Sequence, residues 1–112
     1  MTDAIEGSCH CGVVQVRVAS APTELNDCQC EHCQKRGTLW AYYPKEQVEV
    51  SGPTSIYRWG PETINFHFCG CCGCTTHWSS VDPKRSRMGV NARLFGKAIF
   101  QSIPQQKGGG PR

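Results

Sequence analysis

The stretch that decides the fold is FHFCGCCGCTTHW, residues 66–78. It places four cysteines in six positions, Cys69, Cys71, Cys72 and Cys74. Neither a disulfide nor a single metal ion can use all four sulfurs from so short a piece of backbone. The fold therefore depends on which two of them are used, and on which sulfurs elsewhere in the chain they meet.

The composition favours metal binding over disulfides. The chain has 112 residues, a net charge of +3 and nine cysteines, an odd number that fits complete disulfide pairing badly. Its first ten residues, MTDAIEGSCH, contain no apolar core, so we expect no signal peptide, a cytoplasmic location and reduced thiols. No run approaches the roughly 20 apolar residues of a membrane span. The basic residues are scattered, so we do not expect a nucleic-acid partner.

Apolar residues alternate with polar ones at a period of two, which is typical of strands with one buried face. The alternation is seen in residues 14–18, 48–50 and 64–68. Further short strands are predicted at residues 39–43, 55–59, 75–79, 87–94 and 98–103, and one helical turn within 28–36. Pro and Gly separate these segments. The pattern predicts a mainly β protein of small antiparallel sheets, with one domain at 1–104 and a flexible tail, QQKGGGPR, at 105–112.

Within the opening stretch, Cys69 and Cys72 are the better pair of metal ligands. Gly73 follows the second of them, and glycine permits the tight turn of a zinc knuckle, whose N–H groups point at sulfur. The competing pair, Cys71 and Cys74, is followed by β-branched Thr75, which resists positive φ. We expect Cys71 and Cys74 to be small buried apolar residues. Two further thiolates are needed, either from Cys9-x-Cys11 or from residues 28–33.

The group Cys28-x-Cys30-x-x-Cys33 offers three thiolates and no obvious fourth ligand. Three protein ligands with an open position are typical of catalytic zinc, whereas four form a closed structural site. Alternatives remain open: the fourth position is filled by a neighbouring side chain, or the three thiols bind no metal. The candidates to fill it are His32, His10, His67 and Cys71.

Three thiolates make zinc electron-rich, and therefore a poor activator of water. Such a site can still hold an incoming thiol as thiolate, because coordination lowers the pKa of a group that is about 8.5 when free. The ligand set favours carbon–sulfur chemistry on a small electrophile such as an aldehyde over hydrolysis. Trp40 and Tyr42 follow this group and would share one face of a strand, where they could line a pocket.

Three motifs in this order resemble the glutathione-dependent formaldehyde-activating (GFA) family. They are GSCHCG at residues 7–12, CQCEHC at 28–33 and the sequence from Phe68 to Gly73, with RMGVNARL at 87–94 as a further point of similarity. The resemblance implies a β-tent fold of antiparallel sheets stapled by zinc. It also implies two zinc ions, one structural, held by Cys9, Cys11, Cys69 and Cys72, and one reactive, held by Cys28, Cys30 and Cys33.

The activity implied by the resemblance is condensation of formaldehyde with glutathione, formally a carbon–sulfur lyase reaction run in reverse. The expected partners are a small thiol such as glutathione and an aldehyde, and the sequence does not indicate an oligomeric state. The alternative is a non-catalytic β module, also stapled by zinc, that binds a protein or a nucleic acid. A filled fourth position would favour the module, and an open one under a pocket would favour the enzyme.

Overall fold

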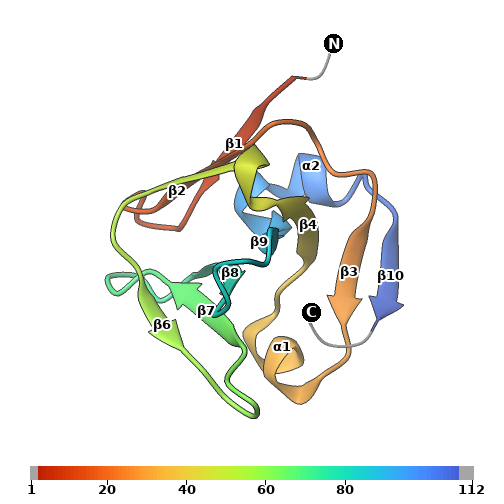
Figure 1. Cartoon of the computed structure of the whole chain (residues 1–112). Helices are drawn as coiled ribbons and strands as arrows, with labels where there is room; N and C mark the ends of the chain where they lie inside the picture. The colour runs from red at the N-terminus through yellow and green to blue at the C-terminus, as the bar shows by residue number, and fades with distance from the viewer. Residues whose placement is uncertain (1–2, 109–112) are drawn as a thin grey trace.

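The computed structural model describes residues 3–108, in which ten strands form two sheets (Figure 1). The smaller sheet is antiparallel and has the order β1 (Ile5–Ser8), β2 (Gln15–Val18), β5 (Val48–Ser51). Val16 and Val18 are buried while Gln15 and Arg17 are exposed, so β2 has the one-sided burial that its alternation predicted. This sheet covers one side of the core.

The larger sheet has the order β10-β3-β4-β9-β8-β7-β6. Its strands are β3 (Leu25–Cys28), β4 (Trp40–Pro44), β6 (Ser55–Tyr57), β7 (Ile64–Phe68), β8 (Thr75–Ser80), β9 (Arg87–Asn91) and β10 (Gln105–Gly108). Short helices lie between strands: α1 (Glu31–Arg36), α2 (Lys97–Phe100), and the 3-10 turns η1 (Lys45–Gln47) and η2 (Ala92–Phe95). The expectation of a mainly β fold is confirmed. Within residues 3–108, no helix is long and apolar enough to cross a membrane.

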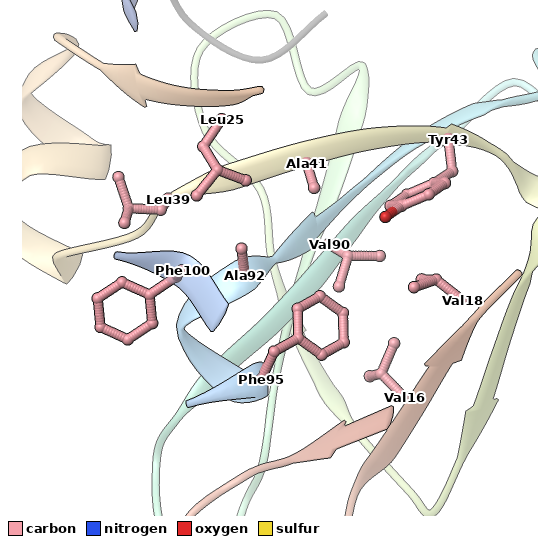
Figure 2. Close-up of a cluster of buried hydrophobic side chains, with 10 residues drawn as sticks. All are labelled: Val16, Val18, Leu25, Leu39, Ala41, Tyr43, Val90, Ala92, Phe95 and Phe100. Carbon is pink, nitrogen blue, oxygen red and sulfur yellow. The ribbon is translucent and has the colours of Figure 1, made fainter. Parts of the chain in front are cut away.

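The main core joins the two sheets. Figure 2 shows Val16 and Val18 of β2 facing Val90 of β9 and Phe95 of η2, with Leu39, Ala41 and Tyr43 from the β4 region on the other side. Each of these side chains is less than a tenth exposed. Gly7 of β1 packs directly against the backbone of Leu94, where a Cβ would overlap the carbonyl. The absence of a side chain therefore lets β1 approach the turn that follows β9.

Three of the predicted segments differ in the structure, and β1 and β3 are strands that the sequence pattern did not predict. The strand expected at residues 98–103 is wrong, because α2 occupies residues 97–100. The strand expected at 87–94 ends at Asn91 and continues as η2. Residues 105–108 are not a flexible tail but strand β10, which pairs in parallel with β3. The rest of the expected tail, 109–112, lies outside the described residues.

The apolar residues of α2 join the main core. Ile99 and Phe100 lie in this single turn and pack in the same core as Phe95. Gly96, at a φ of +93°, separates η2 from α2.

Gly89 of β9 provides a test of how strands β8 and β9 pack. Its register partner is Trp78 of β8, and a Cβ at Gly89 would overlap the indole ring around Nε1. We expect Gly89→Ala to destabilise the fold by about 1–3 kcal/mol, because a buried indole must move. Gly70→Ala is the control, since its Cβ would meet only Ser55 Oγ, at 3.5 Å. Urea unfolding measures both, and equal losses would contradict this packing.

Candidate metal centres

Four sulfurs meet where the β1–β2 connection approaches the β7–β8 connection. Cys9, Cys11, Cys69 and Cys72 each place Sγ within 4.8 Å of the other three. Cys9 and Cys69 are buried, Cys72 is half-buried and Cys11 is exposed. The structure thus brings together the four cysteines that the family resemblance implied. Cys69 and Cys72 therefore meet Cys9 and Cys11, and not the cysteines of residues 28–33.

Each pair of cysteines is presented by a tight turn that ends in glycine. Gly12 and Gly73 both have a φ of +83°, a conformation that favours glycine. The N–H of Gly12 donates to the carbonyl of Cys9, and that of Gly73 to the carbonyl of Cys69. Thr75, which follows the alternative pair, is already in strand β8. The turn chemistry used to choose Cys69 and Cys72 is therefore the chemistry observed.

The four-sulfur cluster fits a tetrahedral metal ion. Zinc–sulfur bonds of about 2.3 Å place neighbouring sulfurs about 3.8 Å apart in a tetrahedron. The Sγ atoms of Cys9 and Cys11, and those of Cys11 and Cys69, are each 3.7 Å apart. Backbone N–H groups of Val14 and Cys71 donate to Cys9 Sγ and Cys69 Sγ. Hydrogen bonds from the backbone N–H groups of Cys74 and Cys11 lower the pKa of the Cys72 thiol to about 5. The backbone donors to Cys69 and Cys72 thus lower the pKa of these two thiols and favour their thiolate form, which binds metal.

The second cluster consists of Cys28, Cys30 and Cys33, whose Sγ atoms also lie within 4.8 Å of one another. Cys28 ends β3, Cys30 is the N-cap of α1, and Cys33 lies in its first turn. The Cys30 sulfur accepts a hydrogen bond from Cys33 N at 3.3 Å, so one side chain both caps the helix and faces the cluster. Gly37 ends the helix in the left-handed region, at a φ of 68°.

The three-sulfur cluster is deeper than the first. Cys28 and Cys33 are 0% and 1% exposed, and only Cys30 is half-buried. Burial raises the pKa of the Cys28 and Cys33 thiols, so both would remain protonated at neutral pH without a nearby cation. Trp40 Nε1 donates a hydrogen bond to Cys33 Sγ at 3.3 Å. Three converging sulfurs with two matched N–H donors fit a thiolate-binding metal ion.

Among residues 3–108, no fourth cysteine, histidine, aspartate or glutamate joins this second cluster. Of the four residues considered as fillers, His10 and Cys71 are exposed and lie on the loops of the other cluster. The ring of His32 packs instead against Phe66, with centroids 4.4 Å apart. Among the described residues the group therefore offers three candidate protein ligands.

A match to a family model covers residues 4–105, nearly the whole of the described chain, under the description glutathione-dependent formaldehyde-activating enzyme. The chain belongs to the GFA family. It is 31% identical over 113 aligned positions to a Halomonas elongata protein with the provisional name glutathione-dependent formaldehyde-activating enzyme. That alignment covers 90% of this chain and 69% of the relative.

A solved structure supports the fold of this GFA chain. A crystal structure of a Rhodobacter sphaeroides protein superposes with a TM-score of 0.74 at 24% identity. The match covers 91% of this chain and all of the other. At that identity the similarity extends to the fold alone.

The histidines on the β7–β8 ladder are structural in this GFA protein. The rings of His67 and His77 stack with centroids 4.0 Å apart. His67 forms hydrogen bonds with Thr54 Oγ1 and Ser79 Oγ, each at 2.8 Å, which occupy both ring nitrogens. Burial, and to a smaller extent the charge of the nearby His67, lowers the pKa of His77 to about 3. His77 therefore packs as a neutral ring. Neither side chain belongs to a group of possible metal ligands among residues 3–108.

Several features around the clusters were not evident from the sequence. Trp40 and Tyr42 do share a face that packs on the three-cysteine cluster, but the bond from Trp40 to Cys33 depends on tertiary approach. Tyr42 Oη accepts a hydrogen bond from Asn26 at 2.5 Å, a contact between strands β4 and β3. The expectation of two buried extra cysteines is wrong for Cys71, which is exposed, and Cys74 is half-buried beside the first cluster.

The two clusters predict different consequences of losing one cysteine. Cys69→Ala breaks the site that joins the two sheets, and should cost several kcal/mol, a large share of a typical domain's stability. Cys30→Ala removes one ligand beside a helix cap, and should leave a folded protein that has lost one metal ion. Metal analysis and urea unfolding measure both effects, with Cys71→Ala as the matched control. If Cys30→Ala unfolds as readily as Cys69→Ala, the division into two kinds of site is wrong.

Proposed function

We propose that this GFA protein is a zinc-dependent carbon–sulfur lyase or synthase that acts on the adduct of a small thiol with formaldehyde or a similar aldehyde. In this proposal Cys9, Cys11, Cys69 and Cys72 hold a structural zinc ion. Cys28, Cys30 and Cys33 hold a second, reactive one. The observation that carries the proposal is the difference between the two clusters: one gathers four sulfurs, the other three.

The chemistry balances without an oxidant or reductant. In the synthetic direction the thiol sulfur attacks the carbonyl carbon, a carbon–sulfur bond forms, and the thiol proton ends on the former carbonyl oxygen. In the lyase direction the same bond breaks and the proton returns to sulfur. A zinc ion held by Cys28, Cys30 and Cys33 would bind the thiol and would lower the pKa of that thiol.

The chain's own residues explain how a thiol is admitted. Cys28 and Cys33 are covered by Trp40, Phe66 and Trp78, whereas Cys30 is half-buried. A substrate thiol therefore approaches from the Cys30 side. The apolar walls exclude water, which strengthens electrostatic interactions at the sulfurs. The hydrogen bonds from Cys33 N to Cys30 Sγ and from Trp40 Nε1 to Cys33 Sγ hold two of the ligands in place.

The proposed partners follow from this chemistry and from the family. Glutathione is the proposed thiol and formaldehyde the proposed aldehyde, as in the family's description. Seven reduced cysteines suit the cytoplasm, where thiols are kept from forming disulfides, and we include that location in the proposal. A net charge of only +3 gives little support for a nucleic-acid partner.

Exchange-sensitive NMR tests the proposal. Glutathione, formaldehyde and their adduct interconvert spontaneously, so the readout is the increase in exchange rate on adding zinc-loaded protein. We expect clear acceleration by the native chain, and a loss on the order of 10²-fold or more in Cys30→Ser, because a ligand is removed.

Cys71→Ser is the matched control, since it removes an exposed thiol that neither cluster uses. It should accelerate exchange as the native chain does. No acceleration with glutathione or any other small thiol would overturn the enzyme proposal and favour the non-catalytic binding module. Equal rates in the native chain and Cys30→Ser would show that the three-cysteine cluster is not the reactive site.

A further inference from the structure

A second concave site lies beside α1, the helix that also carries Cys33. It is a pocket of about 580 Å³ between α1 and the segment that follows β6. Its lining residues are Glu31, His32, Lys35, Arg36, Tyr57 and Trp59. The volume falls within the usual range of small-molecule sites.

This pocket adjoins the three-cysteine cluster. At 3.6 residues per turn, Arg36 lies about 60° and His32 about 100° around α1 from Cys33. His32 also packs on Phe66, which belongs to the same apolar cluster as Cys28 and Cys33. None of the three cysteines lines the pocket, so the two sites are neighbours on one short helix.

The walls of the pocket are aromatic and partly exposed. Tyr57 and Trp59 are 44% and 40% exposed, which is unusual for rings of this size, whereas Trp40 and Trp78 are almost completely buried. Both exposed rings contact His32, with centroid distances of 5.6 and 5.5 Å. These rings offer flat faces on which a planar group can stack.

The rim of the pocket has more positive than negative charge. Lys35 and Arg36 contribute two cations against the one carboxylate of Glu31, which pairs with Lys35 at 3.0 Å. Arg36 is held in place by its contacts with Tyr57 and by a hydrogen bond from Nη1 to Thr75 Oγ1. A guanidinium carries five N–H donors, so the others can bind an anion.

His32 provides an independent indication of a polar ligand. Both of its ring nitrogens are buried, and neither has a hydrogen-bond partner among residues 3–108. Buried polar atoms without partners are uncommon and costly. The ring of His32 contacts the partly exposed rings of Tyr57 and Trp59, and His32 is itself part of the pocket wall.

From these observations we propose that the pocket binds a small planar carboxylate, with its flat group against Trp59 and Tyr57 and its carboxylate at Arg36 and Lys35. The proposal does not depend on the proposed thiol–aldehyde chemistry. The expected affinity for a minimal ligand is weak, about millimolar, because few atoms make contact.

Phenylacetate is a suitable probe, and phenylacetamide and phenethylamine have similar shapes with neutral and positive charge. The zinc-loaded full chain would be titrated by two-dimensional NMR without thiol or aldehyde, following the indole N–H signal of Trp59. We expect phenylacetate to shift that signal and those of α1, and to bind about 3- to 10-fold more tightly than phenylacetamide, with phenethylamine the weakest.

Two substitutions test the two halves of the site. Trp59→Ala should weaken phenylacetate binding by about 5- to 10-fold, through loss of stacking. Lys35→Gln should weaken phenylacetate by about 2- to 5-fold and leave phenylacetamide unchanged. Lys84→Gln, an exposed lysine outside the pocket, is the matched control and should change neither. Urea unfolding of each variant confirms that the fold is retained.

Equal binding of phenylacetate and phenylacetamide would overturn the proposal, as would shifts centred elsewhere or unchanged binding in Trp59→Ala. The outcome is separable from that of the thiol–aldehyde assay, because each experiment uses its own ligand and its own variants. Failure of either leaves the other standing.

Discussion

The close approach of four cysteine sulfurs is the constraint on which this structure depends. Cys9 and Cys11 come from the loop of the three-stranded sheet, and Cys69 and Cys72 from a loop of the seven-stranded sheet. Four thiolates at such distances repel one another unless a cation lies among them, and backbone N–H groups compensate only part of their charge. A metal ion there would tie the two sheets across 58 residues of sequence, as a long-loop cross-link does.

Apart from this four-cysteine cluster, the chain holds a second and different cluster of cysteines. Cys28, Cys30 and Cys33 are presented by the end of β3 and the first turn of α1, elements that β4 and the Trp40 ring keep in place. A site that stabilises the fold uses four sulfurs, whereas a site that must admit a substrate can use three. One short helix carries Cys33 and, on an adjoining face, the cationic rim of the aromatic pocket.

The parts of the fold and of the candidate sites that depend on local sequence could be predicted from it. The alternating valines predicted strand β2, and the glycine after Cys72 favoured Cys69 and Cys72 as the pair of ligands. Both signals are local properties of the sequence. The strand predicted at 98–103 is wrong, because periodicity alone does not distinguish a strand from a helical turn in so short an apolar segment.

Other features have no local signal. Strand β10 is polar, and it forms because β3 offers an edge with which to pair. Likewise, the spacing of the cysteines left two partner pairs open for Cys69 and Cys72, and the resemblance to the family was needed to choose between them before the structure was considered. The pocket at Tyr57 and Trp59 depends on α1 lying beside β6 and β7, which no periodicity reveals.

The central claim is that seven sulfurs divide into four and three around two zinc ions. X-ray absorption at the zinc edge measures the sulfur ligands directly. The account predicts an average of about three and a half sulfurs per zinc, with a lighter atom completing the shell, rising to about four when glutathione is added. A protein that already shows four sulfurs per zinc without added thiol, or no change on adding it, would contradict the account.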